Sequence, residues 1–142
     1  MADPLPPAPP AGCHLRFARP SNDLEAVVRF YRDGLGFELL GGFEDHEGFD
    51  GVMLGHPGAP VHLEFTRELR HVEFHEPSPD QLIVIYLPDP DAWWAAVWRL
   101  ERMGHRSVPA HNPYWDVNGK TFADPEGYRV VLQNAAWPSG GA

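Results

Sequence analysis

The sequence predicts an α+β fold made of two similar βαβββ modules with a shared cleft. The first observation is a near-repeat, because the segment 23–37 has a counterpart 68 residues later in the segment 91–105. The second is that each segment is followed by an apolar strand-like run, at 61–65 and at 128–132. The third is the length of 142 residues, which suits one domain with a sizeable core. A repeat of this size indicates two copies of one supersecondary unit.

The first module begins with a strand and a helix. Residues 14–18 have the alternating character of a strand. The apolar positions with helical spacing that follow are Leu24, Val27, Val28, Tyr31 and Leu35. The N-cap candidates of this helix are Ser21, Asn22 and Asp23. Asn22 and Glu25 have the spacing of a capping box, and Gly34 or Gly36 can end the helix in a left-handed conformation.

Three strands complete the first module. The run 37–40 starts the first of them, and a loop of glycines and acidic residues is expected at 44–50. The runs 51–54 and 61–66 are the other two strands, joined by a turn at 56–58. The predicted order is therefore β-α-β-β-β.

The second module repeats this order. Residues 81–87 form a β-prone run, and Asp89 is expected to cap a helix that has Pro90 at its first position and stops at Gly104. The tryptophans expected to pack between this helix and the sheet are Trp93, Trp94 and Trp98. The remaining elements are a strand at 105–108, a polar-aromatic loop at 111–116, a strand at 120–123, a turn at 124–127 and a last strand at 128–133.

The expected domain organisation is one domain with two short tails. Five prolines and no basic or apolar leader pattern at the start of the chain indicate a disordered tail at 1–13, and a second tail is expected at 137–142. The single domain spans 14–136. Its parts are a first module at 14–66, a connector at 67–80 and a second module at 81–134.

Charge and composition exclude several classes of partner. The net charge is −9 and Lys120 is the one lysine of the sequence, so a nucleic-acid surface is not expected. No apolar run approaches the length of a membrane span. Cys13 is the one cysteine, which fits a reducing cytoplasm.

Two sequence motifs occur in the same order, and at the same separation, as in a known protein family. They are FYRDGLGFE at 30–38 and DPEGY at 124–128, with the strand His62–Phe65 between them. With these motifs, residues 14–134 resemble the vicinal-oxygen-chelate superfamily, which includes glyoxalase I, bleomycin-resistance proteins and extradiol dioxygenases. The motifs are specific for the fold and much less so for function, because this fold hosts many chemistries.

The resemblance implies a fold, a site and an assembly. The sheets of the two modules would curl together around a cleft, and many relatives form homodimers. Metal-binding relatives carry one ligand on the first strand and one on the last strand of each module. A divalent ion there, Zn, Ni, Mn, Co or Fe, would act as a Lewis acid toward a small-molecule substrate.

The four implied ligand positions are only partly filled. Glu64 stands at the carboxylate position of the first module, and its counterpart in the second module is Val131, which cannot ligate. The first-strand position, seven residues before the helix cap, falls on Arg16, with His14 two residues earlier. The corresponding position of the second module falls near Gln81. A metal site of His14, Glu64 and Gln81 therefore stays open as one hypothesis.

A metal-free pocket is the other hypothesis. Arg16, Glu64 and Arg129 would form a charged pocket in which two arginines hold a carboxylate or phosphate, or in which one arginine neutralises Glu64. The other residues expected to contact the ligand are His62, Gln133, Tyr114 and Trp115. This hypothesis predicts a small-molecule-binding protein. The alternative is a metal-dependent lyase, isomerase or dioxygenase in which Glu64 acts with His14 or His62. His71 and His75 in the connector are expected to be exposed and outside any metal site.

Overall fold

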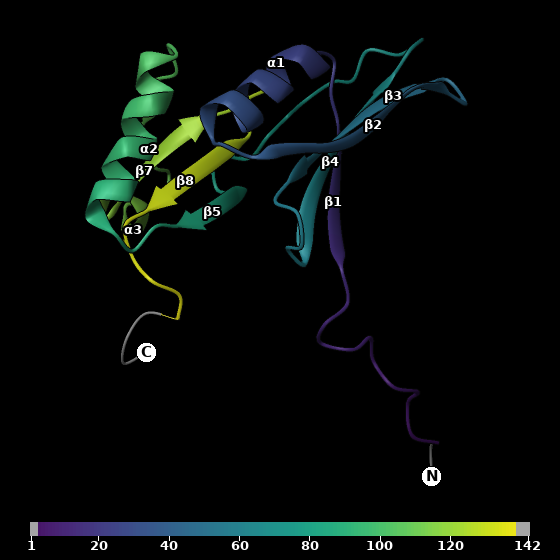
Figure 1. The fold of residues 1–142 in the computed structure, drawn as a ribbon, viewed down its shortest axis with the longest axis horizontal. Coiled ribbons are helices and arrows are strands. Elements are labelled where there is room, and N and C mark those ends of the chain that lie inside the picture. The colour runs from purple at the N-terminus through teal and green to yellow at the C-terminus, as the bar shows by residue number, and fades with distance from the viewer. Residues whose placement is uncertain (1–2, 139–142) are drawn as a thin grey trace.

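A computed structural model describes residues 3–138 and shows two four-stranded sheets lying side by side (Figure 1). Residues 3–13 form no helix or strand and extend away from the two sheets (Figure 1), and the ends of both predicted tails, 1–2 and 139–142, lie outside the described residues. Within the described part, no helix is long and apolar enough to cross a membrane.

The first module has the predicted element order. Its elements are β1 (Leu15–Pro20), α1 (Leu24–Val28), the π-helix η1 (Arg29–Gly34), β2 (Glu38–His46), β3 (Phe49–Gly55) and β4 (Val61–Glu68). The strands lie in the order β1-β4-β3-β2, with β1 parallel to β4 and the other pairs antiparallel. Gly36 has a φ of +80°, so it makes the left-handed exit from the helical segment that only glycine adopts without strain.

Two local predictions for this module were wrong. The capping box of Asn22 and Glu25 is not formed, and the helix cap is Asp23, one of the three candidates, whose carboxylate accepts a hydrogen bond from the Ala26 backbone amide at 3.1 Å. Asn22 instead exchanges two hydrogen bonds with the backbone of Glu73, because the connector passes beside it. The predicted loop at 44–50 is mostly strand, since a tight turn at Glu47 and Gly48, both with positive φ, joins β2 to β3 directly.

The second module repeats the topology of the first. Its elements are β5 (Leu82–Tyr86), α2 (Pro90–Arg102), β6 (Ser107–Val108), α3 (Tyr114–Val117), β7 (Gly119–Ala123) and β8 (Arg129–Gln133). The strand order β5-β8-β7-β6, with β5 parallel to β8, matches that of the first sheet. The duplicated α+β fold predicted from the repeat is therefore confirmed. The short helix α3 replaces part of the predicted loop at 111–116.

One hydrophobic core is shared by the two modules. It joins side chains of the first helical segment, such as Phe30 and Tyr31, to those of α2 and β8, such as Leu100 and Val130. The prediction for the tryptophans was right for Trp93 alone, which packs against this core and donates a hydrogen bond to the Leu132 carbonyl at 2.8 Å. The other two, Trp94 and Trp98, are about half exposed on the outer side of α2.

A buried carboxylate joins the modules at their centre. Asp124, in the turn before β8, accepts hydrogen bonds from the Tyr31 hydroxyl at 2.7 Å and from Arg19 at 3.1 Å. The Arg19 guanidinium also stacks over the Tyr128 ring, 3.7 Å from its centroid. Burial and then the Asp124 carboxylate raise the pKa of Tyr31 well above its usual value. The phenol therefore stays protonated and serves as a donor.

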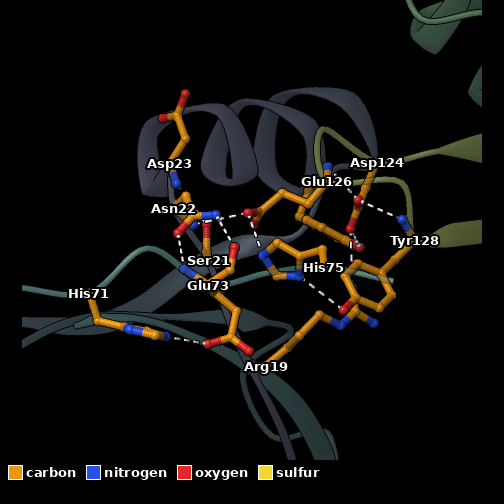
Figure 2. A network of polar contacts seen from close by, with 11 residues as sticks. Arg19, Ser21, Asn22, Asp23, His71, Glu73, His75, Asp124, Glu126 and Tyr128 are labelled. Atoms are coloured by element: carbon orange, nitrogen blue, oxygen red, sulfur yellow. Dashed lines mark hydrogen bonds and ion pairs between the residues drawn. The ribbon is translucent and has the colours of Figure 1, made fainter. Parts of the chain in front are cut away.

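A second polar contact ties the connector to this turn (Figure 2). His75 Nε2 lies 2.8 Å from Glu126 Oε2, without the alignment of a linear hydrogen bond, and His75 Nδ1 lies 3.0 Å from the Tyr128 hydroxyl. Glu126 also accepts from the Asn22 amide at 2.9 Å. The expectation that His75 is exposed was wrong, because its side chain is only 10% accessible. His71 is exposed, as expected, and contacts Glu73.

Candidate functional site

Four of the predicted site residues meet on one face of the first sheet. His62 and Glu64 are two residues apart on β4 and therefore point to the same side of the strand. β1 runs parallel beside β4 with Arg16 opposite His62 in the register. Arg16 donates through Nε to His62 Nε2 at 2.9 Å and through an Nη to Glu64 Oε2 at 3.1 Å. His14, just before β1, contacts His62 Nδ1. We call these four residues the β1–β4 polar cluster.

The electrostatics of the cluster favour the neutral form of His62. Loss of hydration lowers the pKa of His62, and the neighbouring Arg16 and His14 lower it further, against the opposite effect of Glu64. Because Arg16 Nε donates to His62 Nε2, the proton of the neutral ring must lie on Nδ1, where it faces His14. Neutral His62 therefore stands beside the positive Arg16 and near the negative Glu64, and both nitrogens of its ring are already in contact with a neighbour.

A groove runs between the modules next to this cluster. It has a volume of about 640 Å³ and lies between the edge strands β1 and β5. Its first-module wall includes Phe17, Leu63 and Glu64, and its second-module wall includes Gln81 and Leu82. The groove is thus mostly apolar, with carboxylate, imidazole and amide groups at its margin. This is the usual composition of a small-molecule site.

A larger hollow elsewhere on the first module is a weaker candidate. It has a volume of about 760 Å³ beside the start of α1 and the β2–β3 hairpin. Its charged lining residues are Asp23, Glu25, Glu44, Asp50 and Arg67. It contains none of the predicted site residues and has less apolar lining than the groove.

Four other predicted residues lie on the second module, away from the β1–β4 polar cluster. Arg129 donates to the Pro109 carbonyl at 3.2 Å, so it anchors the loop that leads to α3. Gln133 is 3% exposed, and α3 covers this side of the sheet so closely that a Cβ on Gly119 would lie 2.5 Å from the Gln133 side-chain oxygen and from the Trp115 carbonyl. Tyr114 is exposed, with its ring edge-on to that of Trp115.

The predicted pocket of Arg16, Glu64 and Arg129 is therefore not assembled within one chain. The structure brings together His14, Arg16, His62 and Glu64, and Gln81 lines the same groove as His62 and Glu64. The structure puts Arg129 beside the Pro109 carbonyl instead. Sequence reasoning missed the apolar groove residues Phe17 and Leu63. Both lie on predicted strands, each next to a predicted site residue, so strand alternation was the signal that could have found them.

The cluster does not fit a divalent metal in its present form. A metal ion held between His62 Nε2 and Glu64 Oε2 would have to take the place of the Arg16 guanidinium, which donates hydrogen bonds to both atoms. The guanidinium is permanently positive, so it would also repel the ion. Among residues 3–138 there is no group of three or more His, Cys, Asp and Glu arranged to hold a metal ion.

Comparison with known families gives matches over both modules. Residues 15–66 match the YycE-like N-terminal domain, and residues 80–134 match the YycE-like C-terminal domain. The chain is 41% identical over 126 residues to the uncharacterized protein YycE of Bacillus subtilis strain 168, a match that covers 89% of this chain and 91% of that protein.

Solved structures show the same architecture. A YycE protein of unknown function from Bacillus subtilis superposes with a TM-score of 0.83 at 40% identity, over 88% of this chain and 91% of that one. The fosfomycin resistance protein FosX from Mesorhizobium loti gives 0.67 at 12% identity, over 87% and 92%. TnmS3, an antibiotic binding protein from Streptomyces sp. CB03234, gives 0.58 at 23% identity, over 84% and 93%. The last two likenesses concern the fold alone.

Proposed function

Because this chain belongs to the YycE-like family of the vicinal-oxygen-chelate superfamily, we propose that it binds a small organic molecule in the groove between its modules. The observation that carries this proposal is the β1–β4 polar cluster at the margin of an apolar groove of about 640 Å³. That volume lies within the range of about 300–1,000 Å³ that is common for small-molecule sites.

The lining indicates what kind of molecule the groove would take. Phe17, Leu63 and Leu82 would contact an apolar or planar body, whose burial provides most of the binding free energy. Glu64 and His62 point to the other face of β4 from Leu63 and line the margin of the groove, where they would contact a polar end of the ligand and fix its orientation. TnmS3 is an antibiotic binding protein of similar fold, which is consistent with sequestration on this fold. Sequestration needs no chemical step.

A metal-dependent lyase, isomerase or dioxygenase is the alternative. Its specific support is that His14, His62 and Glu64 lie in one cluster, as metal ligands would. Against it stands the position of Arg16, whose guanidinium takes the place that a metal ion between His62 and Glu64 would need. We therefore favour the binding function.

The binding function can be tested with two planar fluorescent probes of opposite charge. The probes are the anion 8-anilinonaphthalene-1-sulfonate and the cation proflavine. Glu64→Gln leaves Arg16 without its carboxylate, so it should strengthen binding of the anion and weaken binding of the cation by roughly ten-fold each. Arg16→Gln should do the opposite. Dissociation constants from fluorescence titration provide the measurement.

Matched substitutions at exposed positions control for net charge. Glu68→Gln lies at the far end of the same strand, and Arg32→Gln breaks an exposed contact with Asp33. Neither variant should change either affinity by more than about two-fold, because exposed charges at a distance are screened by salt. If both probes bind equally well to all four variants, the β1–β4 cluster is not part of the binding site.

We also propose that two chains pair through the edge of the first sheet. Leu15 and Phe17 on the edge strand β1 and Val61 beside them on β4 are 55%, 64% and 40% exposed. An exposed apolar edge strand is a common pairing surface. Light scattering should give twice the chain mass of 15.9 kDa, and Leu15→Asp should return the monomer mass. A wild-type monomer at micromolar concentration would contradict the proposal.

A further inference from the structure

The position of Arg16 between an imidazole and a carboxylate has a chemical consequence. Its guanidinium contacts His62 Nε2 at 2.9 Å and Glu64 Oε2 at 3.1 Å, and both of these acceptors belong to β4. An imidazole nitrogen and a carboxylate oxygen that converge on one cation are the donor types that Zn²⁺, Ni²⁺ and Co²⁺ prefer. Here the cation they converge on is a side chain of the protein.

Both ring nitrogens of His62 are in use. His62 accepts from Arg16 at Nε2 and contacts His14 with Nδ1, so both nitrogens of its ring are engaged. Glu64 is 12% exposed at its side chain and is held by the guanidinium, which is itself 46% exposed. The contacts thus form a continuous series from His14 through His62 and Arg16 to Glu64.

We propose that Arg16 is the resident cation of this site and that its guanidinium excludes divalent metals from a donor pair that would otherwise bind them. The site is then a metal site in which an arginine has replaced the ion. This goes beyond the proposed binding function, which requires no statement about metals. Its direct consequence is that replacing Arg16 by a metal-ligating side chain should create a metal site.

The strand register identifies the substitution that should work best. Position 16 on β1 lies directly opposite His62 on β4, and paired strands are about 4.8 Å apart. In Arg16→His, the new imidazole would therefore stand beside His62 and Glu64 and complete a set of two histidines and one carboxylate. That set is sufficient for several first-row transition metals. Arg16→Lys keeps a positive charge at the same position and should not bind.

The experiment is calorimetric titration of the full, untagged chain with Ni²⁺ and with Zn²⁺. Arg16→His should bind one ion per chain at least ten-fold more tightly than the wild type, and Arg16→Lys should behave like the wild type. Arg32→His adds a histidine beside the exposed Asp33 and controls for adventitious binding by surface histidines. Adding Glu64→Gln to Arg16→His should remove the gain. Circular dichroism confirms that each variant is folded.

Two results would overturn the proposal. One is a wild-type chain that binds one ion tightly and loses it in Glu64→Gln, because the guanidinium would then not exclude the metal. The other is a folded Arg16→His variant with no gain over Arg32→His, because the donor pair would then be unable to ligate. Neither result depends on the probe titrations, so the binding function can fail or succeed separately.

Discussion

Replacing Asp124 by alanine is expected to lower the free energy of unfolding by about 3–5 kcal/mol, the usual cost of removing one partner from a buried ion pair. The Asp124 side chain is 1% exposed and accepts from Arg19 and Tyr31. Its other oxygen accepts from the backbone amides of Glu126 and Tyr128. The substitution would leave all four donors without their acceptor and would bury part of a positive charge without a partner.

Thermal and urea denaturation provide the measurement. A loss of this size corresponds to a decrease in Tm of about 10–15 °C for a domain of this length. Asp124→Asn is the matched control, because its amide oxygen can still accept from the backbone amides while the charge is lost. It should cost less than Asp124→Ala. A loss below about 1 kcal/mol in Asp124→Ala would show that the contact between the modules does not stabilise the fold.

Much of this fold could be predicted from the sequence because its signals are local and occur twice. The helix caps and the glycine exits depend on a few neighbouring residues, and Gly36 and Gly104 have the positive φ expected of such exits. The repeat then adds independent support for each element. The errors occurred where a distant segment decides the outcome. Asn22 has the spacing of a capping residue, but the connector provides a backbone partner that the sequence does not reveal.

The sequence predicted which strands carry the residues of the candidate site, but not which side chains contact one another. Alternation along β4 indicated that His62 and Glu64 share a face, and counting back from the helix cap identified Arg16. The parallel register of β1 on β4 is a long-range pairing, so the contact between Arg16 and these residues could only be one hypothesis among several. For the same reason, Arg129 could not be assigned to the Pro109 carbonyl rather than to Glu64.

Replacing Phe65 by alanine is expected to lower the free energy of unfolding by about 3–5 kcal/mol. Phe65 is 2% exposed, and its ring centroid lies 5.0 Å from that of Tyr31 in the shared core. The truncation removes a large apolar side chain from water-free surroundings and leaves a cavity that the strands cannot close. Urea denaturation should show a lower midpoint with an unchanged m-value. Phe65→Leu keeps most of the volume and should cost less than about 1.5 kcal/mol.

Glu64 is the matched control for Phe65, because the two residues are neighbours on β4 and point to opposite faces. Glu64→Gln keeps the shape of the side chain and breaks a half-exposed ion pair, so it should cost less than about 1 kcal/mol of stability. It should nevertheless change the affinity for charged probes. Phe65→Leu should change stability more than affinity. A Glu64→Gln variant as unstable as Phe65→Ala would mean that the carboxylate serves the fold and not the binding of a ligand.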